Sequence, residues 1–168
     1  MNKHPPIFYL NIRIMIQRIQ SIYLILAFVC MCFALSTPLA EFTNQTVNCK
    51  MTAVRYEIFG TTALNPPATL PWGVLALTFV IIGLTAYIFF QFKNRMKQIL
   101  LCNVSIAVHL FYFITYATYS IAFASHHQMS YSPGFYILLP VASLIFTMLA
   151  RRGVKADEAK VRAADRIR

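Results

Sequence analysis

The chain has 168 residues, of which 58% are hydrophobic and only 12% are charged. This composition excludes an ordinary soluble domain, in which about a quarter of the residues are charged. The formal net charge is +10, but the cations lie in separate polar segments and do not form the dense basic stripe that a nucleic-acid surface requires. We therefore expect one compact membrane-embedded unit, with the lipid bilayer as its surroundings and no nucleic acid as a partner.

Four apolar stretches approach the roughly 20 residues that a helix needs to cross the hydrocarbon core of a membrane. The predicted spans are residues 19–40, 72–92, 98–124 and 135–150. The polar segments around them are residues 1–18, 41–71, 93–97, 125–134 and 151–168. The pattern predicts an all-α membrane protein, an antiparallel bundle of four transmembrane helices.

The cations are sorted between alternate polar segments. Segments one, three and five hold thirteen of the fifteen Lys and Arg residues, and only Lys50 and Arg55 lie in segments two and four. Segments that stay in the cytoplasm carry an excess of Lys and Arg. We therefore predict that the N- and C-termini are both cytoplasmic.

The first span follows a basic segment, as the core of a signal peptide does. Its apolar run is longer than a signal core, and Pro38 with Leu39 makes a poor small-residue cleavage site. We expect a retained membrane anchor. Met15 is a second candidate for the start of the chain.

The long segment 41–71 is predicted to be external. From Val47 onward its apolar and polar side chains alternate, and the phase of the alternation slips between Ala53 and Val54. Period-two alternation favours β-structure, and the slip favours a β-bulge. Gly60 is expected to end the pattern. We predict a small external loop with β-structure that caps the helices.

The third span carries a polar and aromatic stripe on one helical face. The stripe consists of Ser105, His109, Tyr112, Tyr116 and Tyr119. Polar groups in a span face the bundle interior, because lipid cannot satisfy them. Two interpretations stay open: the stripe binds a ligand or relays a proton through His109, or it forms hydrogen bonds between helices.

The fourth span has a weaker stripe of small and hydroxyl residues, which is typical of close helix packing. Its members are Tyr136, Pro140, Ser143 and Thr147. The outer loop carries His126 and His127, but a zinc site takes four protein ligands, or three and a water molecule. Only Cys49 lies in a segment predicted to be external. We therefore expect no metal site, no cofactor and no disulfide framework.

Two motifs lie at opposite ends of the chain. Met15 to Leu24 reads MIQRIQSIYL, and Asp157 to Arg168 reads DEAKVRAADRIR. Together with the four spans, these motifs resemble an uncharacterised four-span integral membrane family of Bacteroidetes-type bacteria, whose members begin with an MIQRIQ-type segment and end in a DE…VRSADRLR-like tail. The resemblance implies the bacterial inner membrane and supplies no catalytic residue.

Both motifs are predicted to be cytoplasmic, so we expect them to contact each other. The candidate interaction residues are Gln17, Arg18, Gln20, Asp157, Glu158, Arg162, Asp165 and Arg166. The tail is expected to form a short helix along the inner membrane surface or against the bundle. Its cations favour anionic lipids, by about 1 kcal/mol for each basic residue near the surface.

The sequence contains no Gly-rich phosphate loop, nucleophile elbow or HExxH helix, and no carboxylate inside a span. We therefore do not expect an enzyme. The first hypothesis is a small scaffold or accessory subunit that binds a protein partner or a second copy of itself. The alternative is a small transporter, or a lipid- or quinone-binding protein, that uses the stripe of the third span; a membrane enzyme ranks third.

Overall fold

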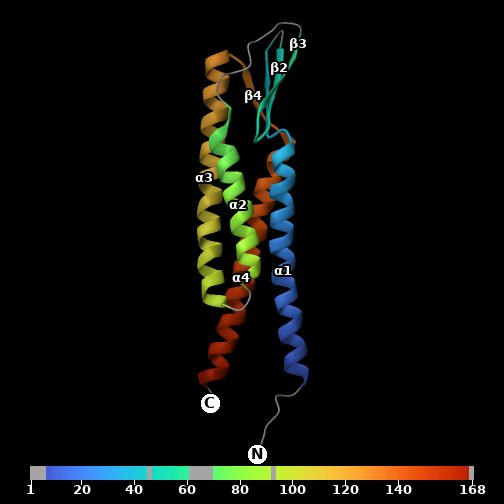
Figure 1. Cartoon of the computed structure of the whole chain (residues 1–168), viewed down its shortest axis with the longest axis vertical. Coiled ribbons are helices and arrows are strands. Elements are labelled where there is room, and N and C mark those ends of the chain that lie inside the picture. The colour runs from blue at the N-terminus through green and yellow to red at the C-terminus, as the bar shows by residue number, and fades with distance from the viewer. Residues whose placement is uncertain (1–6, 45–46, 61–69, 92–93, 167–168) are drawn as a thin grey trace, which may run out of the picture.

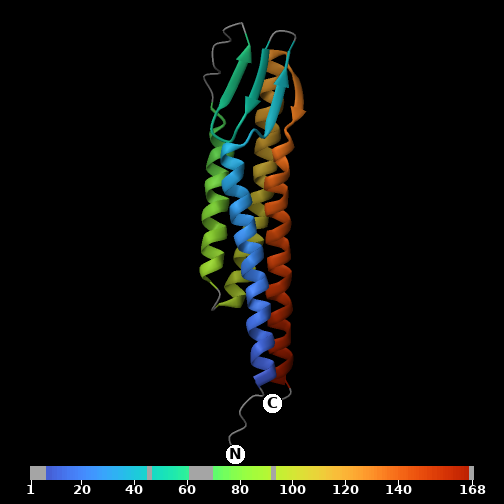
Figure 2. The same cartoon turned by 90° about the vertical axis from the view of Figure 1, so that its right-hand side faces the viewer.

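The computed structural model describes residues 7–44, 47–60, 70–91 and 94–166, without the side chains of residues 7–18, 60, 161 and 164–166. Its helices form a bundle with a small sheet at one end and both termini at the other (Figures 1 and 2). The helices are α1 (Ile7–Ser36), α2 (Trp72–Phe90), α3 (Arg95–His127) and α4 (Leu138–Arg166), the last preceded by the 3-10 turn η1 (Phe135–Ile137). All four are long and apolar enough to cross a membrane. We call the two ends of the bundle the sheet end and the terminal end.

Local sequence determines where the helices stop. Pro38 cannot continue α1, which ends at Ser36. At the end of α3, Gln128 adopts the left-handed conformation with a φ of 49°. The backbone N–H of Met129 then donates to the carbonyl of Ala124 at 3.0 Å, which is the Schellman arrangement. This cap turns the chain back along the sheet.

The sheet joins two connections that are far apart in sequence. Its strands are β1 (Ala40–Thr43), β2 (Val47–Met51), β3 (Tyr56–Gly60) and β4 (Ser130–Pro133). They pair antiparallel in the order β3-β2-β1-β4. The β-structure predicted within residues 41–71 is confirmed. Strand β4 was not predicted. All four of its residues are exposed, so burial does not impose on it the alternation of apolar and polar residues that indicates a half-buried strand.

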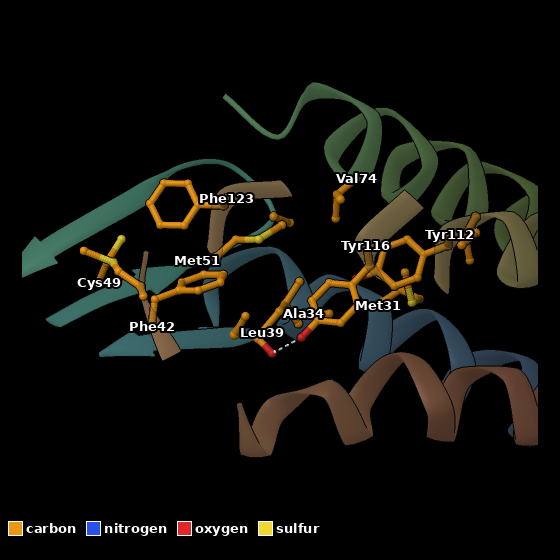
Figure 3. Packing of buried hydrophobic residues seen from close by; sticks show 14 of the residues in the cluster. Met31, Ala34, Leu39, Phe42, Cys49, Met51, Val74, Tyr112, Tyr116 and Phe123 are labelled. Carbon is orange, nitrogen blue, oxygen red and sulfur yellow. Dashed lines mark hydrogen bonds between the residues drawn. The ribbon is translucent and has the colours of Figure 1, made fainter. Parts of the chain in front are cut away.

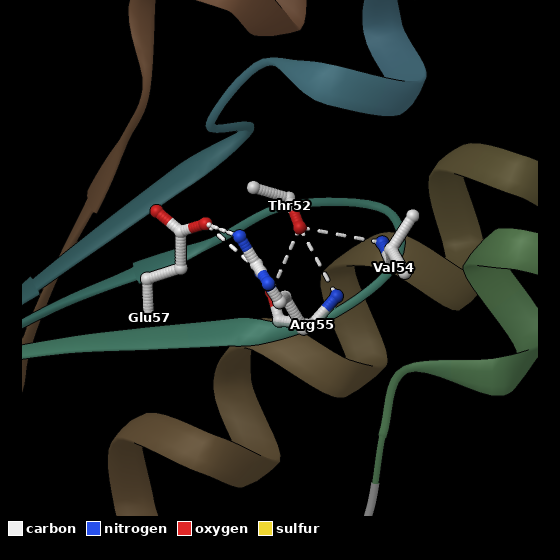
Figure 4. A network of polar contacts seen from close by, with 4 residues as sticks. All are labelled: Thr52, Val54, Arg55 and Glu57. Atoms are coloured by element: carbon white, nitrogen blue, oxygen red, sulfur yellow. Dashed lines mark hydrogen bonds and ion pairs between the residues drawn. The ribbon is translucent and has the colours of Figure 1, made fainter.

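The predicted β-bulge is wrong. The phase of alternation slips because the chain reverses direction there, and residues 52–55 form the turn between β2 and β3. The Thr52 hydroxyl donates to the Arg55 carbonyl at 2.9 Å and accepts the N–H groups of Val54 and Arg55 at 3.3 and 3.0 Å (Figure 4). An ion pair of 2.8 Å between Arg55 and Glu57 completes the turn.

The inner face of the sheet packs on the last turns of α3. The rings of Phe42 and Tyr56 contact Phe123, with centroid separations of 4.7 and 4.4 Å. The 33 residues of α3 extend over about 50 Å at the usual helical rise. The helix is therefore long enough to pass the other three and provide a base for the sheet (Figure 1).

The backbone of Leu39 connects all of these elements. Its N–H donates to the carbonyl of Met51 at 2.7 Å, and its carbonyl accepts the N–H of Gly134 at 3.0 Å and the hydroxyl of Tyr116 at 2.8 Å (Figure 3). A Cβ atom at Gly134 would lie 2.7 Å from the backbone oxygen of Pro38, so this close approach requires glycine. The junction of α1 and β1 is thereby fixed to the sheet, to the start of η1 and to α3.

The sequence suggested that the tail forms a separate short helix, but the structure shows no separate helix in its described residues. The tail continues α4 without interruption to Arg166, and its first residues, Gly153 and Asp157, contact Gln20 of α1. The other helices also differ from the predicted spans at their ends: α1 stops four residues earlier, at Ser36, and α3 extends from Arg95 to His127. Apolar runs indicate the part of a helix that avoids water, whereas a helix continues wherever its backbone can remain hydrogen-bonded.

Replacing Phe42 by Ala is expected to destabilise the sheet end by about 3–5 kcal/mol, because it leaves a cavity against Phe123. The Cys49 thiol reports on this packing, since its side chain is buried and burial raises its pKa to about 11. With the other three cysteines replaced by Ala, alkylation of Cys49 at pH 8 should be slow in the parent chain. It should become at least about a hundred-fold faster in the Phe42→Ala chain, since every 1.4 kcal/mol corresponds to a factor of ten.

The matched control is Phe59→Ala, which removes a ring of the same size from an exposed position in β3. Alkylation of Cys49 should be unchanged in this variant. In the folded parent chain, the alkylation rate should rise about ten-fold per pH unit up to about pH 11 and level off above it, because the thiolate is the reactive form. Equal alkylation rates in the Phe42 and Phe59 variants would contradict this packing of the sheet.

Candidate functional site

The structure buries most of the polar stripe of α3 inside the bundle. Ser105, His109, Tyr112 and Tyr116 are buried, whereas Tyr119 is partly exposed. Burial alone does not separate a ligand site from helix packing, because both need an inward-facing polar group. The hydrogen bonds of the stripe show which of its polar groups are already paired within the protein.

His109 uses both ring nitrogens in contacts within the protein. Its Nδ1 atom lies 2.7 Å from the carbonyl oxygen of Ser105, and its Nε2 atom lies 3.1 Å from the hydroxyl oxygen of Ser143 in α4. A carbonyl only accepts, so Nδ1 carries the hydrogen and Nε2 accepts the hydrogen of Ser143 in a neutral ring. The stripes predicted for the third and fourth spans therefore face each other, and this pair joins α3 to α4.

Two further members of the stripe reach other elements, whereas the hydroxyl of Ser105 has no hydrogen-bond partner among the described residues. The Tyr116 hydroxyl donates to the Leu39 carbonyl and lies 3.1 Å from the Tyr131 hydroxyl in β4. Tyr112 interacts with Thr78 on α2, although its hydroxyl forms no hydrogen bond of good geometry within the described residues. The stripe thus contacts α2, α4 and the sheet, which is the arrangement of a packing seam.

A second polar contact lies near the terminal end, between α1 and α4. The Gln20 side chain donates from Nε2 to Oδ2 of Asp157 at 2.9 Å, and both residues are buried. Gly153 lies one helical turn before Asp157, and a Cβ atom there would lie 2.8 Å from Cγ of Gln20. We call Gln20, Gly153 and Asp157 the basal clasp.

The basal clasp lies beside an ion pair that reaches α3. Arg162 donates to Glu158 at 3.0 Å and also contacts the sulfur of Met96, in the first turn of α3, at 3.3 Å. A hydrogen bond to a charged group contributes about 1.5–3 kcal/mol, whereas the exposed ion pair contributes about 0.3–0.5 kcal/mol. Of these contacts, the Gln20–Asp157 bond is the main polar determinant of how α1 and α4 pair.

The structure thus brings together one pair from the two end motifs, Gln20 and Asp157. The side chains of Gln17, Arg18, Asp165 and Arg166 lie outside the described residues. Sequence reasoning missed Gly153. The available signal was a glycine inside a helical pattern, which commonly marks a close approach of another element.

The histidines at the end of α3 pack against aromatic rings. His127 contacts Phe123 with a centroid separation of 4.6 Å, and His126 contacts His127 at 4.8 Å. Among the residues that the structure describes, no three His, Cys, Asp or Glu side chains converge as metal ligands. The four cysteines are free thiols.

The comparison with protein families concerns nearly the whole chain. The family described as "Domain of unknown function (DUF4293)" matches residues 16–167. The chain belongs to this family. A search of the curated proteins found no match. The DUF4293 match contains all three residues of the basal clasp, and the uncharacterised family expected from the two end motifs is thereby confirmed.

In this DUF4293 protein, replacing two helical glycines by Ala is expected to change stability in opposite directions, because only Gly153 lies in the basal clasp. Gly153→Ala should destabilise the protein, because the new Cβ displaces Gln20 and weakens its bond to Asp157. Gly83→Ala is the control, since nothing lies within 4 Å of the added atom. It should stabilise α2 by about 0.5–1 kcal/mol, the usual difference between Gly and Ala in a helix.

Unfolding in mixed detergent micelles would measure both variants, and Gln20→Ala would test the cause. If the added Cβ acts through Gln20, Gly153→Ala should cost less in a Gln20→Ala chain than in the parent chain. An additive effect of the two substitutions would show that Gly153 and Gln20 are not coupled.

Proposed function

We propose that this DUF4293 protein is a four-span integral protein of the bacterial cytoplasmic membrane. The outer surface of the helices supports this proposal, because large apolar side chains on every helix are more than half exposed. Examples are Phe33, Phe79, Phe111 and Leu138. Soluble monomers rarely expose contiguous apolar surface over such a length, whereas a bilayer covers it.

The charges support cytoplasmic termini. Both termini lie at the terminal end (Figure 1), and thirteen of the fifteen cations belong to the segments predicted for that side. The other two cations are neutralised at the sheet end, where Lys50 pairs with Glu41 at 3.2 Å and Arg55 pairs with Glu57 at 2.8 Å. This asymmetry agrees with the positive-inside rule.

Within the membrane, the protein acts as a small scaffold or accessory subunit. One observation carries this proposal: α1 and α4 both continue past the α2–α3 turn at the terminal end (Figures 1 and 2). The basal clasp joins the two helices where the tail begins, and the tail continues as a helix to Arg166. We call α4 from Gly153 to Arg166, with the part of α1 that faces it, the basal projection.

The basal projection presents cations to a partner. Lys155, Lys160 and Arg162 are exposed in the α4 part of the basal projection, and Arg152 is exposed on α4 directly before it. Such a surface fits an acidic face of a protein partner, and anionic head groups attract the same side chains. The stripe of α3 is a weaker candidate for function, because both nitrogens of His109 already bond within the protein.

The orientation can be tested with single cysteines in a chain that keeps only the buried Cys49. Ser132→Cys, at the sheet end, should react with a membrane-impermeant maleimide in cells whose outer membrane is permeabilised and whose inner membrane is intact. Lys97→Cys, at the α2–α3 turn, should react only after the inner membrane is permeabilised. The reverse pattern would overturn the proposed orientation.

The scaffold role can be tested with Arg152, Lys155 and Lys160 replaced together by Gln. This variant retains the basal clasp, so its abundance in the membrane should equal that of the parent chain. A protein that co-purifies with the parent in fixed stoichiometry should be lost from the variant and retained by the His109→Leu control. If the co-purifying protein is lost from the His109→Leu variant but retained by the triple variant, the scaffold role of the basal projection would be contradicted and a role of the α3 stripe would be favoured.

A further inference from the structure

Arg151 on α4 is a partly buried cation without a partner among the described residues. Its Nε atom is buried and forms no hydrogen bond with them, and none of their ion pairs includes Arg151. A guanidinium group cannot be deprotonated in a protein, so burial cannot be relieved by loss of its charge. Because a buried N–H of a charged group is costly to leave without an acceptor, an acceptor from elsewhere is expected at Arg151.

The guanidinium group of Arg151 lies beside α3. Arg151 is close enough to Cys102, a fully buried residue of α3, for an electrostatic interaction between the two side chains. Arg162 follows Arg151 by eleven residues, or about three helical turns, and therefore lies on the same face of α4. The guanidinium group of Arg162 contacts the sulfur of Met96 in α3. Both observations place Arg151 at the seam between α3 and α4.

The carboxylates of the chain do not supply the missing acceptor. Of its five acidic side chains, the four that the structure describes have other partners. Glu41 pairs with Lys50, Glu57 with Arg55 and Glu158 with Arg162, and Asp157 accepts the side chain of Gln20. Asp165 follows Arg151 by fourteen residues on α4, which is about 21 Å along a helix. An anionic partner of Arg151 must therefore come from another molecule.

Arg151 lies where the exposed surface of α4 changes from apolar to basic. Ile145 and Met148, in the two turns before it, are exposed apolar side chains. Arg152 and Lys155, in the turn after it, are exposed cations. In a membrane, such a boundary lies at the level of the lipid head groups. The anions at that level are phospholipid phosphates, whose oxygens match the planar fork of a guanidinium group.

We infer that Arg151 binds the phosphate of an anionic phospholipid at the seam between α3 and α4. Lys155, one helical turn further along the same face of α4, contributes a second positive charge. This inference rests on the proposed membrane location and orientation. It goes beyond the general attraction of anionic head groups by the basal projection, because it assigns one lipid to one unpaired guanidinium group.

The test measures thermal unfolding of the purified full-length protein in mixed micelles of a non-ionic detergent and one added lipid. The two lipids are phosphatidylglycerol and a glucosyl diacylglycerol with identical acyl chains, which lacks the phosphate. With phosphatidylglycerol at about ten times its Kd, the Tm of the parent chain should be about 3–6 °C higher than with the glycolipid. Native mass spectrometry should show one phosphatidylglycerol retained by each protein.

Arg151→Met removes the guanidinium group and keeps an unbranched apolar side chain beside α3. The Tm of this variant should be the same in the two kinds of micelle. With the glycolipid, it should be no lower than that of the parent chain, because Arg151 has no partner to lose there. Arg152→Met is the matched control, since it removes the same charge from the adjacent, exposed position. This control should keep the Tm difference of the parent chain.

Three results would contradict the inference. The first is the same Tm of the parent chain in both kinds of micelle. The second is an equal loss of the Tm difference in Arg151→Met and Arg152→Met, which would indicate unspecific attraction of anionic lipid. The third is a lower Tm of Arg151→Met than of the parent chain in the glycolipid, which would reveal a partner of Arg151 within the protein.

Inorganic phosphate, added to the parent chain in glycolipid micelles, distinguishes a lipid from a soluble ligand. It should leave the Tm unchanged, and a rise equal to that with phosphatidylglycerol would assign the site to a soluble phosphate instead of a lipid. Failure of the proposed orientation would appear separately, in the maleimide labelling of Ser132→Cys and Lys97→Cys. A protein with the proposed orientation that fails the lipid test would lose only the Arg151 assignment.

Discussion

The carbonyl group of Leu39 is the point on which the sheet end depends. Its two acceptor positions are filled by a backbone N–H from the start of η1 and by the hydroxyl of Tyr116. A buried carbonyl without these partners would lose about 1–3 kcal/mol. Because the donors come from α3 and from the chain that follows β4, the bond fixes three parts of the fold at once. Pro38 ends the helix just before this point, and Gly134 permits the approach of the second chain.

Polar contacts of this kind occur at three levels of an otherwise apolar bundle. Leu39 holds the sheet end, the His109–Ser143 pair holds the middle, and the basal clasp holds the terminal end. Apolar surfaces alone leave the rotation and sliding of helices poorly defined in lipid, since lipid competes equally well for them. A few inward-facing hydrogen bonds select one arrangement, because each leaves a polar group unsatisfied when a helix turns away.

The same arrangement separates the structural surfaces from those available to partners. His109 and Tyr116 of the α3 stripe are hydrogen-bonded within the protein, so the surface that we propose for a partner is formed by the exposed cations of the basal projection. This surface lies toward the terminal end.

The sequence determined the four helices, because long apolar runs have few alternatives to a helix in lipid, and it determined the β-structure in residues 47–58 from alternation. It also pointed to Gln20 and Asp157 through the two end motifs. Only the tertiary structure decided that the slip of phase was a turn, that β4 completes the sheet, and that Gly153 makes room for Gln20. The physical reason is that periodicity records which side of an element is buried, whereas the identity of the neighbouring element depends on contacts between residues far apart in the chain.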